Sequence, residues 1–149
     1  MRAVVQRVAS ARVRVGEETV ARMESGLLAL VGVARGDGLE QARELARKLV
    51  ALRIFEDEGG RMNRGLLEVG GTLGIVSQFT LLGDARKGRR PSWQDAAEPE
   101  VAEPLIEALA EEARRAGAPV VCGRFRARME VALVNLGPVT LLLDTEKRF

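Results

Sequence analysis

The most suggestive polar group in the sequence is SQFT, Ser77 to Thr80, at the end of the apolar run that begins at Leu73. It places two hydroxyls, an amide and a phenyl ring side by side, a set that can bind a polar ligand with an adenine-like or amino-acid-like part. Thr80 could be a nucleophile in principle, but no base stands beside it in the sequence. A plain strand end without a ligand is the alternative interpretation of this motif.

A second candidate is GPVT, Gly137 to Thr140, inside the apolar run Val134 to Leu143. Glycine weakens a strand interior, and proline cannot donate to the ladder. The simple interpretation is a turn from which the last strand starts at Val139. The alternative is a cis Gly137–Pro138 bond. Such a bond turns two successive carbonyls in a similar direction, where they could accept hydrogen bonds from an ammonium group.

A basic loop with an aromatic residue, RKGRRPSW, is the third candidate. Its cations are Arg86, Lys87, Arg89 and Arg90, and Trp93 ends it. Cations that bind phosphates, with a ring on which a base can stack, are a common means of contacting RNA. The net charge of the chain is only +2, so an ordinary solvated loop is the alternative.

The residues that are missing narrow the chemistry further. The chain has no histidine and a single cysteine, Cys122. This composition excludes Ser-His-Asp and Cys-His catalysis and the usual zinc sites, and we expect neither a metal nor another cofactor. It also excludes an intrachain disulfide, which fits a reducing compartment. No apolar run approaches the ~20 residues of a membrane span, and the first residues lack a signal peptide's apolar segment. We therefore predict a cytoplasmic protein.

Hydrophobic patterns predict the elements that position these motifs. Glycine turns and alternating or continuous apolar runs indicate short strands over Arg2–Val8, Ala11–Val15, Thr19–Met23, Leu27–Val33 and Leu73–Thr80. Apolar stripes at helical spacing indicate one helix that Asp37 caps, with Glu40 as its capping-box partner, and a second over Pro99–Ala116. Two closing strands are expected over Arg128–Asn135 and Val139–Leu143.

This order of elements predicts an α+β fold. We expect residues 1–149 to form a single domain, in which a largely antiparallel or mixed β-sheet packs with two long helices. The central strands are apolar on both faces, so both faces need cover, and two helices do not supply it. We therefore expect a homodimer with closely associated sheets.

Taken together, the motifs resemble those of the D-aminoacyl-tRNA deacylase family along essentially the whole chain. The family's motifs occur here in order as QRV (Gln6–Val8), SQFTL (Ser77–Leu81), RPS plus an aromatic residue (Arg90–Trp93), GRF (Gly123–Phe125) and VNxGPVT (Val134–Thr140). The departures are minor: tryptophan stands at 93 where phenylalanine is common, and Leu136 occupies a variable position.

The resemblance implies a homodimer that proofreads translation by hydrolysing the ester between tRNA and a D-amino acid or mischarged glycine. It implies a site at the dimer interface in which Ser77, Gln78, Phe79 and Thr80 form one wall. The partner's Gly137 and Pro138 would enter as a cis pair, bind the α-amino group and leave no room for an L side chain. The resemblance assigns Arg7 to holding the partner's loop, and Phe125 and Met129 to the terminal-adenosine pocket.

The resemblance also implies a mechanism without histidine, in which the 2′-hydroxyl of the terminal ribose assists hydrolysis. Backbone N–H groups near Phe79 and Thr80 would stabilise the developing oxyanion, and Thr80 as nucleophile remains the alternative. Arg86, Lys87, Arg89 and Arg90 would contact the tRNA backbone. No membrane or DNA partner is expected.

Two rival functions stay open at this stage. One is a relative of the same fold that removes L-alanine from threonine tRNA, although Phe79 favours the D-specific branch. The other is a dimer that binds RNA through the basic loop and performs no chemistry.

Overall fold

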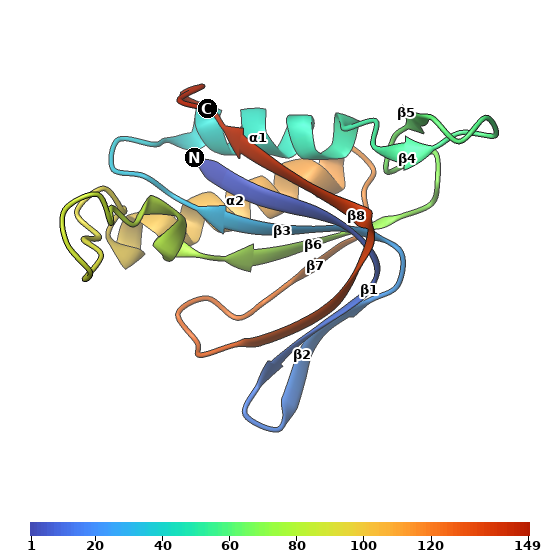
Figure 1. Ribbon diagram of the computed structural model, residues 1–149. Helices are drawn as coiled ribbons and strands as arrows, with labels where there is room; N and C mark the ends of the chain where they lie inside the picture. Colours follow the sequence, from blue (N-terminus) through green and yellow to red (C-terminus); the bar gives the residue numbers. More distant parts are fainter.

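The computed structural model describes all residues from 1 to 149, and it has the expected α+β composition (Figure 1). The elements are, in order, β1 (Arg2–Val15), β2 (Glu18–Met23), β3 (Gly26–Gly32), α1 (Leu39–Ala51), β4 (Phe55–Glu56), β5 (Met62–Arg64), β6 (Thr72–Ser77), the 3₁₀ turn η1 (Phe79–Leu82), α2 (Pro99–Arg115), β7 (Val120–Cys122) and β8 (Glu130–Asp144).

The main sheet is mixed, as the sequence predicts. Its order is β2-β1-β3-β6-β7, and β8 pairs with β1 as well. β1 is antiparallel to β2, β3 and β8, whereas β3, β6 and β7 run parallel to one another. β1 and β8 bend strongly along their length, so the sheet curls toward an open barrel (Figure 1).

Both helices cover one face of this sheet (Figure 1). Alternate residues of the strands, such as Val5, Ala29 and Ile75, point into one apolar cluster with Leu45 of α1 and Leu109 of α2. Every second residue of the strands faces the helices and packs there against their apolar stripes, so this cluster is the main core.

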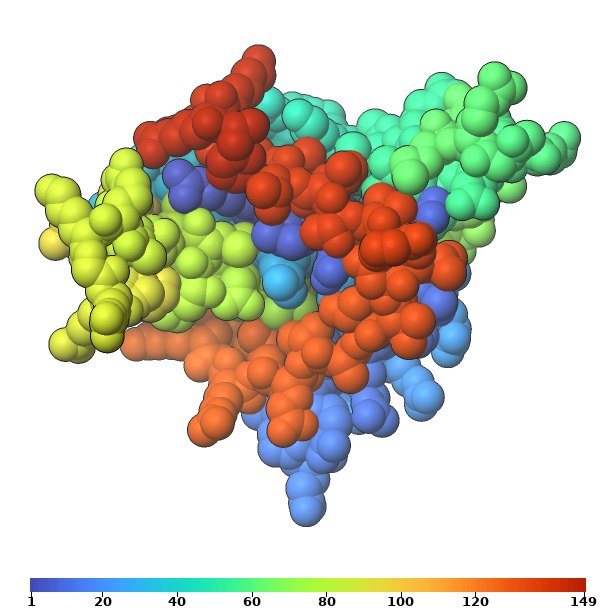
Figure 2. Space-filling view, viewed as in Figure 1, coloured from blue at the N-terminus to red at the C-terminus, as the bar shows by residue number.

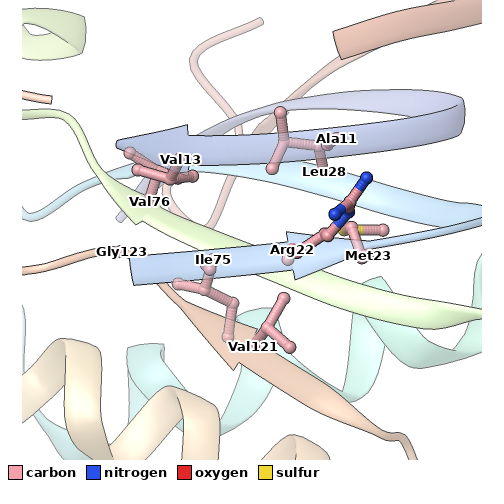
Figure 3. A pocket seen from close by; sticks show the side chains of 11 residues that line it. Ala11, Val13, Arg22, Met23, Leu28, Ile75, Val76, Val121 and Gly123 are labelled. Carbon is pink, nitrogen blue, oxygen red and sulfur yellow. The ribbon is translucent and has the colours of Figure 1, made fainter. Parts of the chain in front are cut away.

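A second, smaller core fills the curl of the sheet. Figure 3 shows its side chains, with Ala11 and Val13 of β1 facing Met23 of β2 and Val76 of β6. The cavity between them measures about 10 Å³ and is lined mainly by aliphatic groups. This volume is about that of one water probe, so the cavity is a packing defect and not a ligand site.

The rest of this face of the sheet has no helix over it and carries exposed apolar side chains. Leu142 of β8 pairs with Val4 of β1, and Val4 pairs with Leu30 of β3, so these side chains form one row. Leu142 is 60% exposed, and Val134 and Leu136 of the same strand are 56% and 48% exposed. Figure 2 shows β8 lying across this face of the molecule.

Several predicted boundaries were wrong because long-range contacts decide them. The two expected N-terminal strands are one strand, β1, and the two closing strands are one strand, β8. In each case β-bulges keep the interrupted halves in the same ladder. β6 ends at Ser77 instead of Thr80.

The expected cap of the first helix was also wrong. Gly38 is the N-cap, and its N–H donates to the Gln41 side chain (2.9 Å). Asp37 is unavailable because its carboxylate accepts hydrogen bonds from the Met1 ammonium (2.7 Å) and from the Ala34 N–H (2.6 Å). The second helix begins at Pro99 as predicted and contains Pro104.

Candidate functional site

The SQFT motif lies at the end of β6, where the strand gives way to η1. The Gln78 N–H donates to the Val31 carbonyl (2.7 Å), which extends the pairing with β3 by one more bond. η1 then turns back over the end of the sheet, with Leu82 buried beneath it and Phe79 exposed. In this short turn the Leu81 N–H bonds to the Gln78 carbonyl, so the N–H groups of Phe79 and Thr80 have no acceptor within it.

A groove of about 530 Å³ opens beside this turn. Ser77, Gln78 and Phe79 line one side of it, and Phe125 and Met129 line it as well. The structure therefore brings these predicted residues, nearly 50 positions apart in the chain, into one groove. A mostly apolar groove with a few polar groups is the usual form of a small-ligand site.

Thr80 lies beside this groove and is not part of its lining. Its hydroxyl accepts a hydrogen bond from the Gln78 amide and is exposed. No base contacts it, so the structure offers no means of activating a Thr80 nucleophile.

Sequence reasoning missed other parts of the groove, among them α2, its N-cap and two arginines from distant loops. The α2 N-cap Glu98 forms an ion pair with Arg35 (3.1 Å), and Glu100 in the first turn pairs with Arg126 (3.8 Å). Arg35, Glu98 and Arg126 belong to the groove lining, so exposed, exchangeable charges lie at its rim. No local pattern relates these residues, because they come from parts of the chain that are far apart in the sequence.

The Gly137–Pro138 bond is cis, which confirms the second interpretation of GPVT. Gln6 pairs with Thr140 and Val8 with Asn135, so the residues between Asn135 and Thr140 form a bulge opposite a much shorter piece of β1. We call Leu136, Gly137 and Pro138 the Gly-Pro loop, and all of it is exposed.

Asn135 closes the base of the Gly-Pro loop. Its side-chain oxygen accepts from the Val139 N–H (2.8 Å), and its amide nitrogen donates to the Thr140 hydroxyl (3.0 Å) and the Val139 carbonyl (3.3 Å). These bonds replace the ladder contacts that the bulge removes.

Arg7 supports the same loop from beneath and is only 4% exposed. Its Nε donates to the Leu136 carbonyl (3.0 Å), its Nη1 to the Ile54 carbonyl (2.7 Å) and its Nη2 to Glu56 (3.4 Å). This guanidinium thus ties the loop of its own chain to β4, and its fork fixes the direction of all three bonds.

The Gly-Pro loop lies far from the groove of its own chain. It leaves β8 beside Arg7, and Arg7 is level with Leu27 of β3 and hence with Leu73, near the start of β6. Ser77 is at the other end of β6, about 13 Å further along at ~3.3 Å per residue. The structure therefore brings the SQFT and adenosine-pocket predictions together but leaves Gly137 and Pro138 apart from them.

The basic loop extends from one edge of the molecule, opposite the edge that carries the β4–β5 hairpin (Figure 2). Arg86 is bound to Asp84 through its Nη2 (2.7 Å), and hydrogen bonds from Arg86 lower the pKa of Asp84 to about 2. Lys87, Arg89 and Arg90 are exposed.

Trp93 connects this basic loop to the groove. Its ring contacts Phe79 edge to face, with 5.4 Å between centroids. The structure contains no group of three or more acidic or cysteine side chains that could hold a metal ion. None of its helices is long and apolar enough to cross a membrane.

Comparison with known proteins gives this geometry a family context. The family model described as D-Tyr-tRNA(Tyr) deacylase matches residues 4–144. A D-aminoacyl-tRNA deacylase of Anaeromyxobacter dehalogenans is 58% identical over 149 residues and covers 100% of both chains. The D-aminoacyl-tRNA deacylase of Roseiflexus sp. is 58% identical over 145 residues, which is 97% of this chain and 94% of the relative.

Solved structures share the fold. The c-Myc DNA Unwinding Element Binding Protein superposes with a TM-score of 0.91 at 35% identity, covering 97% of this chain and 99% of its own. A probable eukaryotic D-amino acid tRNA deacylase gives a TM-score of 0.78 at 19% identity, covering 95% of this chain and 97% of its own. The second likeness concerns the fold alone.

Proposed function

The chain belongs to the D-Tyr-tRNA(Tyr) deacylase family and is an enzyme of that kind, and we propose that the Gly-Pro loop of a second copy completes its groove. The observation that carries this proposal is the separation of the loop from the groove within one chain. Each lacks what the other offers: the groove has aromatic rings and the Ser77 hydroxyl, and the exposed loop has backbone carbonyls.

The uncovered face of the sheet supports this homodimer. The row of Leu142, Val4 and Leu30 would be buried by a second copy, together with Leu136 of the Gly-Pro loop. Burial of such a patch supplies roughly 25 cal/mol for each Å² of apolar area. A closed two-fold arrangement also allows each chain to give its loop to the groove of the other.

In the proposed site, Phe125 and Met129 receive the terminal adenosine, and Ser77, Gln78 and Phe79 form the wall beside the reacting ester. Gly137 and Pro138 of the second copy bind the α-amino group through their carbonyls. Because this backbone cannot move aside as a side chain could, an L side chain is excluded, whereas D-amino acids and glycine fit.

The proposed chemistry uses a hydroxyl of the substrate's own ribose and two backbone donors of η1. The 2′-hydroxyl of the terminal ribose assists attack on the ester, and the N–H groups of Phe79 and Thr80 donate to the oxyanion. Their lack of acceptors within η1 supports this role. In this mechanism the Thr80 hydroxyl takes no part in the reaction. Lys87, Arg89 and Arg90 bind the tRNA backbone. Arg86 contributes less, because it is paired with Asp84.

On this proposal, residues 1–149 act as one deacylase domain that proofreads aminoacyl-tRNA in the cytoplasm. The experiment that tests it compares hydrolysis of D-tyrosyl-tRNA, glycyl-tRNA, L-tyrosyl-tRNA and L-alanyl-tRNA(Thr). We expect turnover of the first two only. Similar rates for D- and L-tyrosyl esters would contradict exclusion of the L side chain, and turnover of L-alanyl-tRNA(Thr) alone would assign the rival editing function.

A substrate change tests the role of the tRNA. D-tyrosyl-tRNA that ends in 2′-deoxyadenosine should bind with unchanged KM and react at least about 100-fold more slowly, since a positioned reacting group is worth that much or more. An unchanged kcat with this substrate would rule out assistance by the 2′-hydroxyl.

A further inference from the structure

A row of residues at the end of the sheet supports η1, and the proposed mechanism does not use it. Asp144 of β8 pairs with Arg2 of β1, and Arg2 pairs with Gly32 of β3. This row lies at the end of the sheet where Ser77 pairs with Val31, so it lies next to the SQFT motif and away from the Gly-Pro loop.

Gly32 lets η1 approach the backbone of β3 closely. A Cβ atom at this position would come within 2.5 Å of the Leu82 side chain and 2.9 Å of the Gln78 carbonyl oxygen. Both distances are shorter than van der Waals contact, so η1 packs on a place that only glycine leaves open. Packing alone, however, does not fix the orientation of the peptide groups in the turn.

Arg2 provides a directional bond to the turn. Its Nη1 donates to the Leu81 carbonyl (3.1 Å), and its Nε lies 3.5 Å from Oδ2 of Asp144. Leu81 follows Thr80 directly, and its own N–H closes the first bond of η1. The guanidinium therefore holds the turn that directs the N–H groups of Phe79 and Thr80.

Asp144 holds Arg2 in turn, and its carboxylate is 2% exposed. Its Oδ1 accepts from the Glu146 N–H (2.9 Å), whereas its Oδ2 is buried with no hydrogen-bond partner. Arg2 is the cation beside this oxygen. A buried charge is costly unless it is paired, so Asp144 favours one placement of the Arg2 side chain.

We propose that Arg2, oriented by Asp144, is a positioning residue for the deacylase reaction: it fixes η1 so that the Phe79 and Thr80 N–H groups meet the oxyanion. The effect on catalysis rests on the proposed function of η1, whereas the mechanical link between Arg2 and η1 does not. Arg2 acts through its geometry, because a lysine would keep the charge and lose the fork that reaches Asp144 and Leu81 together.

The test compares Arg2→Lys and Asp144→Asn with the unchanged protein, using Arg43→Lys on the exposed face of α1 as the matched control. Steady-state kinetics with D-tyrosyl-tRNA gives kcat and KM, and amide hydrogen exchange measures η1 directly. We expect Arg2→Lys to lower kcat about tenfold with KM within about twofold, since a small misplacement of catalytic groups slows the chemical step. Asp144→Asn should shift both readouts in the same direction.

Hydrogen exchange separates positioning from overall stability. In Arg2→Lys the amides of Leu81 and Gly83 should exchange about tenfold faster, while those of β3 and the melting temperature stay unchanged. Faster exchange throughout β1 and β3 would overturn the proposal in favour of a purely structural role. A raised KM with unchanged kcat would also overturn it, because Arg2 would then contact the substrate.

Different results would refute the role of Arg2 and the proposed function. Unchanged exchange in η1 together with unchanged kcat in Arg2→Lys would refute the role of Arg2 alone. If the unchanged protein failed to hydrolyse D-tyrosyl-tRNA, the proposed function would fall, while the exchange data would still decide whether Arg2 holds the turn. Faster exchange in Arg2→Lys but not in Asp144→Asn would show that Asp144 is not needed to orient Arg2.

Discussion

η1 and the Gly-Pro loop lie toward opposite ends of the strand ladder and are held in different ways. η1 packs on the sheet with Leu82 buried beneath it, and it lines a groove of its own chain. The Gly-Pro loop extends from a bulge, is tied down by Arg7 and Asn135, and contacts no groove of its own chain. The Gly-Pro loop is thus exposed and yet held by hydrogen bonds, which is why we propose that it serves a second copy of the chain.

Of the substitutions that test this difference, replacement of Gly137 by alanine should have the largest effect on activity. Gly137 has φ of +132°, and a Cβ atom there would come within 2.7 Å of Val139 Cγ2 and 3.0 Å of Arg7 Nη2. The loop must therefore move, and we expect kcat/KM for D-tyrosyl-tRNA to fall by about 100-fold or more.

Gly16→Ala is the matched control for that variant. Gly16 also has positive φ (+58°), but nothing lies within 4 Å of its Cβ position. The control should lose about 1 kcal/mol of stability and no activity beyond a factor of two. Equal activity of Gly137→Ala and Gly16→Ala would show that the Gly-Pro loop takes no part in the reaction.

Arg7→Lys should have the next largest effect. Lysine keeps the positive charge but cannot serve the Leu136 and Ile54 carbonyls and Glu56 at once, so the loop loosens. We expect kcat to fall about tenfold and the free energy of unfolding to fall by about 1–3 kcal/mol. Glu56→Gln removes only the charge of the exposed Glu56 side chain, which contacts Arg7 at 3.4 Å, and should change stability by less than about 1 kcal/mol. An unchanged kcat in Arg7→Lys would show that the Gly-Pro loop functions without the bonds from Arg7.

Replacement of the basic loop's free cations should have a smaller effect, confined to binding. Arg89→Ala with Arg90→Ala should raise KM for tRNA by about three- to tenfold and flatten its salt dependence, since each phosphate contact releases counterions. Arg86→Ala should do less, because Asp84 already occupies that cation. Asp84 protonates only near its lowered pKa of about 2, so the pair is lost as the pH falls through that value and is intact at neutral pH. A KM equal to that of the unchanged protein in both variants would exclude the loop from RNA contact.

Thr80→Ala should have the smallest effect. Its hydroxyl accepts from Gln78 and faces no base, so we expect kcat to stay within about fivefold of that of the unchanged protein. Near-complete loss of kcat with normal folding would restore the Thr80 nucleophile.

The same two regions show what the sequence could reveal. SQFT, Phe125 and Met129 were assigned through motif resemblance, and the structure brings Ser77, Gln78 and Phe79 into one groove with Phe125 and Met129. Glycine and proline within an apolar run indicated only an interruption of the strand; the cis bond at Gly137 was one of two interpretations, the one that the family resemblance implied.

Other features depend on contacts that no local pattern encodes. No sequence motif marks Arg2, Gly32 or Asp144. Only the register of the strands shows that they lie in one row. Asp37 has the composition of a helix cap, but the Met1 ammonium and the Ala34 N–H compete for its carboxylate. The hairpin β4–β5 is too short and polar to leave a hydrophobic period.

The central claim, that one chain's loop completes another chain's groove, is tested most directly by subunit mixing. Gly137→Ala chains carry a damaged loop and an intact groove, and Phe79→Ala chains carry the reverse. Each variant alone should be nearly inactive toward D-tyrosyl-tRNA. After unfolding and refolding as an equal mixture, half of the dimers are mixed, and each of these has one intact site.

We expect the mixture to regain about one quarter of the activity of the unchanged protein. Mixed dimers that form, as shown by mass spectrometry, and yet remain as inactive as their parents would contradict it, because the site would then lie within a single chain.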